Sequence, residues 1–350
     1  MMSDHGEMLK NILINNIPNA KVVSGGRFVL TKCVFCDDGK HHDSMHLYIN
    51  VECNGEVPWC YCHICKTSAW VTSNFLSSNF GIYDVDFLIR HNKYFKKIRK
   101  SGAGIRRKSF SQVKYSISNN FISDNELSEV KLKYINNRLG TNLIYEDLMN
   151  DKIVLNLYDL LNSNNIKSIT RHINVIDELD RSFIGFISSD NASINFRNLR
   201  PKSLNPPLNK RYIKYAIFDD NNSGSGFYML PNSIIITKPE RIKIHIAEGP
   251  FDILSIYHNL RKTRNHNIYA AVNGSNYINL VKHFINILQL MYIEIHLYID
   301  SEIDMYTVNE IAKYLRPFGT PFYLHSNSME GEKDFGVPLD RIIESVERIL

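Results

Sequence analysis

The sequence lacks any long apolar run. In its 350 residues no stretch of about 18 consecutive apolar residues occurs, so we expect neither a transmembrane helix nor a membrane partner. The N-terminal residues do not combine a charged segment with an apolar one, so we expect no secretory signal. Cysteine is absent from most of the chain, because all six cysteines lie between Cys33 and Cys65. Since a disulfide framework scatters its cysteines, this confinement favours a metal site in a reducing cytoplasm.

Length and composition are typical of a soluble protein with several domains. The chain is 44% hydrophobic and 22% charged, and its net charge is a modest +5. At this length we expect two or three domains, each with a core of its own. Alternating apolar runs and runs with helical spacing both occur, so we predict a multidomain chain of the α/β and α+β classes.

The cysteines form two CxxC knuckles of identical spacing. One runs from Cys33 to Cys36 and the other from Cys62 to Cys65, with 25 residues between them. Residues 45–51 between the knuckles alternate as a strand does. Four thiolates carried on such a small sheet form a zinc ribbon, in which they hold Zn²⁺ tetrahedrally at about 2.3 Å. We therefore predict one structural zinc ion per chain.

Other residues near the knuckles are alternative zinc ligands. Cys53 and Cys60 are surplus to a four-thiolate site. The competing imidazoles are those of His41, His42, His46 and His63.

A strand followed by a helix presents the first candidate catalytic acid. Residues 242–247 alternate and predict a strand that delivers Glu248 to its C-terminal end. Gly249 suits a tight turn, and Pro250 suits the first turn of the helix that follows.

A second strand in the same series ends in further acids. Residues 293–299 predict a strand that ends at Asp300, with Glu302 and Asp304 just beyond. Open α/β sheets place their ligands at the carboxyl ends of their strands. Clustered carboxylates repel one another unless a divalent cation lies between them. The pattern therefore predicts a Mg²⁺ or Mn²⁺ site formed by Glu248, Asp300, Glu302 and Asp304.

Two stretches are strongly basic. The first has eight cationic residues and no acid, namely Lys93, Lys96, Lys97, Arg99, Lys100, Arg106, Arg107 and Lys108. We interpret it as a linker between domains, which can also follow the phosphates of a nucleic acid.

The second basic stretch, residues 195–215, also lacks acids. It interleaves Phe196, Tyr212 and Tyr215 with cations, which suits a single strand because charge binds the backbone and rings stack on bases. Its candidate nucleotide-binding residues are Arg197, Arg200, Lys210, Arg211 and Lys214. An exposed proline-rich loop is the alternative interpretation. Further upstream, residues 152–158 and 182–188 predict strands.

With these residues placed, the chain resembles a DNA primase of the bacterial and phage type. Residues 241–336 resemble the Toprim domain of that family: Glu248-Gly249 with Asp252 matches the first motif, and Asn273-Gly274 follows the next strand. The family's Asp-x-Asp pair falls on Asp300 and Glu302, where Glu replaces the usual Asp and Asp304 is the next acid. Lys333-Asp334 resembles the terminal element of the domain.

The resemblance implies four regions. Residues 1–92 would be a zinc-ribbon template-binding domain, 93–112 a basic linker, 113–230 a mixed α/β primase-type subdomain, and 231–350 the Toprim domain. No GxxxxGK[ST] sequence occurs, so the replicative helicase is expected to be a separate protein.

The implied function is synthesis of short RNA primers on a single-stranded DNA template from ribonucleoside triphosphates. Glu248, Asp300 and Glu302 would be catalytic, and Asp304 and Asp334 would add magnesium ligands. Whether Glu248 acts as base or ligand stays open, as does the choice between Glu302 and Asp304. Lys333 would meet a phosphate. The expected compartment is the cytoplasm, or the host cytoplasm if a phage encodes the protein.

Three rival functions share parts of this pattern. A Toprim nuclease or a topoisomerase fragment would use the same acids, the latter with a nucleophilic tyrosine. A DNA clamp of the recombination-mediator type also joins a CxxC zinc site to a Toprim fold, although such clamps are shorter and lack a region like 113–230.

Overall fold

The computed structural model describes most of the chain. The described residues are 3–36, 45–65, 67–100, 116–118, 125–166, 173–200, 208–217, 226–231, 241–263, 266–274, 276–288, 293–300 and 304–350. They form a mixed α/β structure with three sheets, which confirms the predicted mixed α/β class. Within these ranges, no helix is long and apolar enough to cross a membrane.

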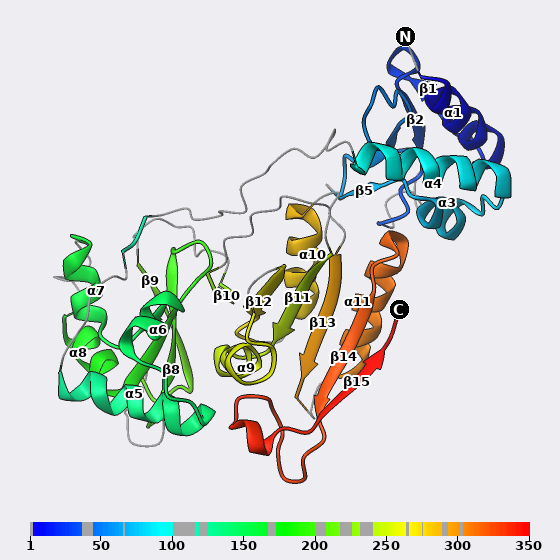
Figure 1. Cartoon of the computed structure of the whole chain (residues 1–350). Coiled ribbons are helices and arrows are strands. Elements are labelled where there is room, and N and C mark those ends of the chain that lie inside the picture. The colour runs from blue at the N-terminus through cyan, green and yellow to red at the C-terminus, as the bar shows by residue number, and fades with distance from the viewer. Residues whose placement is uncertain are drawn as a thin grey trace.

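The N-terminal unit is a five-stranded antiparallel sheet with three α-helices packed around it (Figure 1). Its elements are α1 (Asp4–Asn16), β1 (Lys21–Val23), η1 (Ser24–Gly26), β2 (Phe28–Thr31), β3 (Leu47–Asn50), β4 (Trp59–Cys62), β5 (Ser68–Trp70), α3 (Ser73–Phe80) and α4 (Val85–Lys100). Leu9 and Leu13 of α1 share the core of this unit with Val29 and Ile49 of the sheet. The strand predicted over 45–51 is confirmed as β3.

Helix α4 includes the first part of the predicted basic linker. Tyr94 on this helix donates a hydrogen bond to the carbonyl oxygen of Cys53 at 2.5 Å, so α4 packs against the N-terminal sheet. Residues 93–100 of the predicted linker belong to this helix, and residues 101–115 lie outside the described part of the chain.

The middle unit combines helices with a four-stranded antiparallel sheet of order β6-β7-β8-β9. Its elements are α5 (Glu126–Leu139), α6 (Tyr145–Asn150), β6 (Ile153–Val154), α7 (Leu157–Ser163), α8 (Ile173–Ser182), β7 (Phe183–Ile187), β8 (Ser193–Asn198) and β9 (Tyr212–Ala216). The strand predicted over 182–188 is confirmed as β7. The strand predicted over 152–158 is wrong beyond β6, because the Asn156 side chain accepts the Asp159 N–H at 2.9 Å and caps α7.

The C-terminal unit is a six-stranded sheet of order β10-β12-β11-β13-β14-β15. Its elements are β10 (Tyr228–Met229), β11 (Ile242–Ala247), α9 (Pro250–Ser255), η4 (Ile256–Arg261), β12 (Asn267–Ala271), α10 (Tyr277–Ile287), β13 (Ile293–Ile299), α11 (Met305–Leu315), η5 (Arg316–Phe318), β14 (Phe322–Asn327), η6 (Leu339–Arg341) and β15 (Glu344–Arg348). The four inner strands are parallel and the two outer ones antiparallel. The strands predicted at 242–247 and 293–299 are both confirmed.

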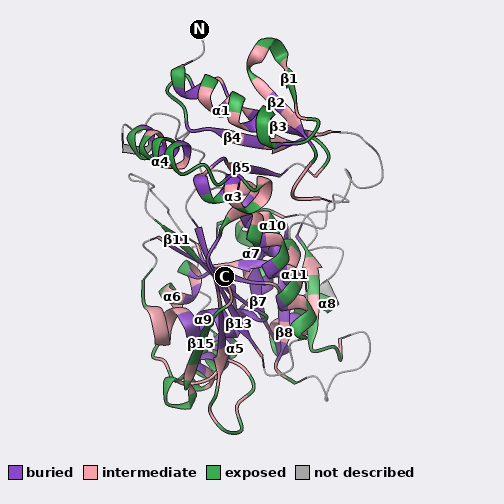
Figure 2. Cartoon of the chain, turned by 90° about the vertical axis from the view of Figure 1, so that its right-hand side faces the viewer, coloured by how far each residue is buried: buried purple, intermediate pink, exposed green. Residues whose placement is uncertain are grey.

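The two faces of this sheet differ in chemistry. On one face, α10 and α11 cover an apolar core of isoleucine, leucine and phenylalanine, so the inner strands are buried there (Figure 2). The other face carries a row of stacked rings: His245 stacks on Tyr269 at 4.7 Å and on His296 at 5.0 Å. The ring nitrogens of His296 form hydrogen bonds, one with His325 at 2.8 Å and one with Glu294 at 2.9 Å. A buried polar row of this kind is tolerated because its members bond to one another.

The middle and C-terminal units share one core. Phe186 of β7 packs edge-on against Tyr228 and Phe251, with ring centroids 5.4 Å apart in each case. Tyr228 also links both sheets, since it pairs with Ala271 of β12 and bridges to Ser188. Their relative position is therefore set by close packing, which matters for the site between them.

The N-terminal unit contacts the C-terminal unit at the starts of the parallel strands (Figure 1). The Phe35 ring stacks on Phe318 with centroids 4.8 Å apart. Asn79 donates a hydrogen bond to the carbonyl oxygen of Pro317 at 3.0 Å.

Candidate functional site

The four knuckle cysteines converge at one end of the N-terminal sheet. Cys33 and Cys36 follow β2, and Cys62 ends β4, with Cys65 in the turn after it. All four sulfur atoms lie within 4.8 Å of one another, and those of Cys33 and Cys65 are 3.9 Å apart. Tetrahedral zinc with Zn–S bonds of about 2.3 Å separates its sulfurs by about 3.8 Å. The predicted four-cysteine cluster is thus confirmed, and it could hold one zinc ion.

The alternative zinc ligands that the structure describes (Cys53, Cys60, His46 and His63) do not join this cluster. Among the described residues, these four cysteines are the one group of three or more histidine, cysteine or acidic side chains placed to share a metal ion. Cys53 and Cys60 are buried in the core of the N-terminal unit. His41 and His42 lie outside the described residues.

The cluster gives a direct metal-content prediction. Cys62→Ser should release zinc and lower the thermal stability of the N-terminal unit, because folding of such ribbons is coupled to metal binding. Elemental analysis of the purified variant measures this loss. Cys60→Ser is the matched control: it changes a buried cysteine of the same strand and should keep one zinc per chain. Full zinc in the Cys62 variant, or loss in the Cys60 variant, would contradict the assignment.

A second candidate site lies at the other end of the molecule, where parallel strands end. β11 and β13 pair in parallel, with Ile246 opposite Leu297, so Glu248 and Asp300 leave the sheet at the same edge. The chain passes from β11 to β12 on one side and then to β13 on the other, which makes this a topological switch point. Open α/β sheets bind their ligands at that position.

Asp252 occupies the centre of this edge. Its Oδ2 accepts the Gly249 N–H at 2.9 Å, which caps the first turn of α9. The close approach explains two glycines, since a Cβ would lie 2.9 Å from Oδ2 at Gly249 and 2.7 Å from Oδ1 at Gly336. Burial raises the pKa of the Asp252 carboxyl well above its ordinary value, and the charges of Asp334 and Asp300 raise it further.

The predicted acids differ in their surroundings. Glu248 is exposed and Asp300 half-buried. Asp334 accepts the Gly336 N–H at 3.0 Å, which fixes the loop carrying exposed Lys333. Asp304 caps α11 by accepting the Tyr306 N–H at 2.9 Å.

Glu302 lies outside the described residues. The oxygens of the described acids do not converge as the cysteine sulfurs do, so the edge is a group of neighbouring charges.

The middle unit brings part of its basic stretch to this edge. The guanidinium groups of Arg197 and Arg211 lie over the Tyr212 ring at 4.7 and 5.6 Å. The Tyr212 hydroxyl in turn lies 3.8 Å from the position a Cβ would take at Gly249. Nε and Nη1 of Arg197 are buried without a hydrogen-bond partner among the described residues. Such N–H groups are suited to an anionic ligand.

The other predicted cations are placed differently. Arg200 donates hydrogen bonds to Ser182 Oγ at 3.2 Å and to the Arg181 carbonyl at 3.3 Å, so its guanidinium is bonded to the end of α8. Lys210 and Lys214 are exposed. Within the basic stretch, Arg197 and Arg211 thus lie over Tyr212 beside the acidic edge, whereas the Arg200 guanidinium is bonded to the end of α8.

Two further residues at this edge, Arg138 and Tyr277, are not among the site residues predicted from the sequence. Arg138 of α5 lies over the Phe251 ring at 4.6 Å, and its Nη2 is 3.2 Å from the Cβ position of Gly336. Its helix has no sequence motif, so no local signal could have shown that its last turn meets Asp252. Tyr277 begins α10; burial raises the pKa of its phenol, and the charges of Glu248 and Asp300 raise it further. A phenol held protonated in this way is not prepared to act as a nucleophile.

Comparisons with known proteins do not assign a family to this chain. No protein-family model matches the chain, and no curated protein matches it.

The acidic edge gives a prediction about stability. Since the pKa of Asp252 is raised by folding, its stabilising effect is present in acid and is lost as pH rises through the folded value. Asp252→Asn removes the repelled charge but keeps an oxygen to accept the Gly249 N–H. Without divalent cations at pH 8, the variant should be more stable by at least about 1 kcal/mol in urea unfolding.

Magnesium should narrow this difference in stability. Added Mg²⁺ should raise the melting temperature of the wild type more than that of Asp252→Asn, because the ion neutralises the charge that the variant lacks. Asp340→Asn, at an exposed acid of η6, is the control and should behave as the wild type. If Mg²⁺ does not change the melting temperature of the wild type, the edge holds no cation.

Proposed function

We propose that this protein is a DNA primase with a Toprim-type catalytic unit, which makes short RNA primers on single-stranded DNA. The observation that carries the proposal is the meeting of Glu248, Asp252 and Asp300 with the guanidinium groups of Arg138 and Arg197 at one sheet edge. A nucleoside triphosphate arrives as a metal complex with a polyanionic tail, so its site needs acids for the metal and cations for the phosphates.

The donor set at this edge fits Mg²⁺ or Mn²⁺. All the candidate donors are carboxylate oxygens, which these hard cations prefer. The repulsion that raises the pKa of Asp252 is what a bound cation would relieve. Glu248, Asp300 and Asp334 would hold the ions, together with Glu302. When bound, the ions supply charge neutralisation and activate the attacking hydroxyl.

The side chains around the acids have separate tasks in this proposal. Arg197 and Arg138 would bind the triphosphate through their unbonded N–H groups, and Arg211 would add charge beside Tyr212. Exposed Lys210, Lys214 and Lys333 would contact the template or primer backbone. Glu248 is open to solvent, so it can act either as a base toward the 3′-hydroxyl or as a metal ligand.

The middle unit distinguishes this proposal from its rivals. A clamp that only encircles DNA has no need for guanidinium groups aimed at an acidic edge, whereas a polymerase needs them for its nucleotide. A topoisomerase requires an activated tyrosine, whereas burial raises the pKa of the two phenols described beside these acids, those of Tyr212 and Tyr277. A nuclease would share the acids and is separated by experiment.

The test is an assay with single-stranded DNA, labelled ribonucleotides and Mg²⁺. A primase makes short RNA, a nuclease shortens the DNA, and a clamp only binds it. Asp300→Ala should reduce primer synthesis by roughly a thousandfold, because a lost metal ligand removes several kcal/mol of transition-state stabilisation. Asp340→Ala, at an exposed acid, should leave the rate unchanged. Primers made by Asp300→Ala at the wild-type rate would refute the proposal.

A matched pair of arginines tests the nucleotide subsite. Arg197→Ala should raise the KM for ribonucleotides by about tenfold or more, because it removes buried charged donors at the acidic edge. Arg200→Ala changes an arginine only three residues further along the chain, whose guanidinium donates a hydrogen bond to Ser182 at the end of α8. It should keep the wild-type KM. Equal effects of the two substitutions would contradict the placement of the triphosphate beside Arg197.

A further inference from the structure

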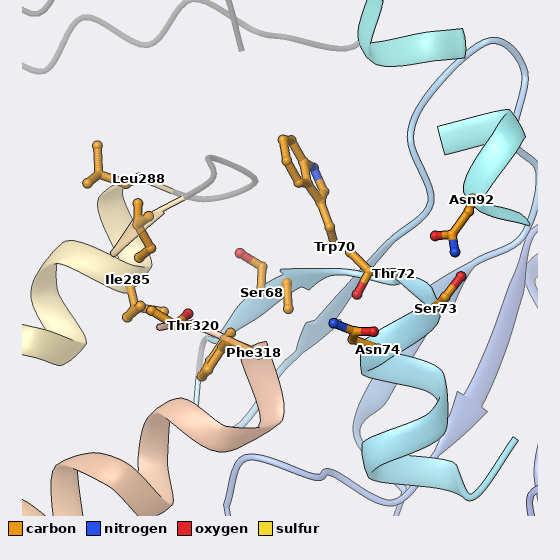
Figure 3. Close-up of a pocket in the computed structure, with 13 residues that line it drawn as sticks. Ser68, Trp70, Thr72, Ser73, Asn74, Asn92, Ile285, Leu288, Phe318 and Thr320 are labelled. Carbon is orange, nitrogen blue, oxygen red and sulfur yellow. The ribbon is translucent and has the colours of Figure 1, made fainter. Parts of the chain in front are cut away.

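A cavity of about 210 Å³ lies where the N-terminal unit meets the C-terminal unit (Figure 3). Trp70, Thr72 and Asn74 line it from the N-terminal side, and Phe318 and Thr320 line it from the other. It lies at the starts of β13 and β14, at the edge of the sheet opposite to the acids. Since β13 has seven residues, about 23 Å of strand separates the two edges.

The lining of this cavity mixes polar and apolar side chains and carries no charged one. Ser68, 7% exposed, has a buried Oγ with no hydrogen-bond partner in the described part of the chain. The side-chain amides of Asn74 and Asn92 are exposed at the cavity and form no hydrogen bond with any other described residue. An anion would find no countercharge here, and a purely apolar ligand would leave these polar groups unpaired.

A nucleobase satisfies both requirements. It is planar and uncharged, offers donors and acceptors along its edge, and has faces that stack on aromatic side chains. Asparagine amides form paired hydrogen bonds with such edges. The indole of Trp70 supplies an aromatic wall, fixed by edge-on contact with Phe95 at 5.4 Å.

Helix α4, which contributes Asn92 to the cavity lining, also carries cations. Arg90, Lys93, Lys96 and Lys97 are all exposed, and no ion pair joins them to another described residue. Lys96 lies one helical turn after Asn92 and hence on the same face as this cavity residue. A strand with a base in the cavity would therefore have cations beside its phosphates. A free base has no phosphates and would not interact with these cations.

We propose that this junction binds single-stranded DNA, with one base in the cavity and the backbone along α4. Because the acids lie at the opposite sheet edge, this base is an anchor and is not the base being copied. The inference extends the proposed primase function by a second template contact, but the binding itself needs neither Mg²⁺ nor nucleotides. It is therefore measured separately from catalysis.

The experiment uses the two tryptophans of the chain. Trp59→Phe leaves Trp70 as the only tryptophan, so selective excitation of tryptophan reports on it alone, and Asp300→Ala in the same chain suppresses turnover. A 12-residue DNA strand should quench Trp70 fluorescence. A strand of the same length with abasic sites throughout keeps the phosphates but should bind about tenfold more weakly and leave the fluorescence unchanged.

Two double variants separate the base from the backbone. Asn74→Ala with Asn92→Ala should bind the normal strand about as weakly as the abasic one. Lys93→Ala with Lys96→Ala should lower the slope of log affinity against log salt by about 1.4, because two phosphate contacts are lost. Lys133→Ala, at an exposed lysine of α5, is the control and should keep the slope. Zinc content and melting temperature verify that each variant folds.

Equal affinity for normal and abasic strands, or unchanged Trp70 fluorescence, would overturn the proposal. Binding of deoxyadenosine monophosphate as tight as that of the strand would overturn it too, since the site would then take free nucleotides. If the wild type makes no primers while Trp70 quenching persists, the primase assignment fails and the anchor site stands.

Discussion

Parallel pairing of β11 with β13 is the constraint on which the rest of the structure depends. It sends Glu248 and Asp300 out of the sheet at one edge, and the turn after Glu248 adds Asp252 between them. Bringing these charges together costs free energy, and this cost contributes to the raised pKa of Asp252. The surrounding architecture offsets that cost by holding guanidinium groups close by. Gly249 and Gly336 provide the space that this crowded edge needs.

The guanidinium groups come from a different part of the chain, so the acidic edge is complete only when two units pack together. Arg138, near the end of a helix of the middle unit, lies over the ring of Phe251, the neighbour of Asp252. Arg197, on a strand of the same unit, lies over the ring of Tyr212, whose hydroxyl approaches Gly249. The shared core around Phe186, Tyr228 and Phe251 fixes that approach. Since a core of large aromatic rings permits little sliding, the distance between acids and cations is set by packing rather than by charge.

The N-terminal unit is joined to this body at the far edge of the same sheet, by the Phe35–Phe318 stack and a few polar contacts. The thiolate cluster and the acidic edge therefore lie at opposite ends of the parallel strands (Figure 1). In the proposed primase, this arrangement would separate the place that holds the template from the place where nucleotides are joined. A strand bound at both places would run along the sheet.

Local spacing in the sequence determined the four-cysteine cluster, the strands β11 and β13, and the acids at their ends, because these features depend on residues close together along the chain. Tertiary structure decided the rest. Alternation at His245 and His296 predicted a strand correctly, yet could not show that these polar residues are buried in a bonded row. Nothing near Arg138 distinguished it from any other helical arginine, and nothing in the basic stretch separated Arg197 from Arg200. Those differences arise from which units pack together, and such packing depends on contacts between distant parts of the chain, such as that of Phe186 with Phe251.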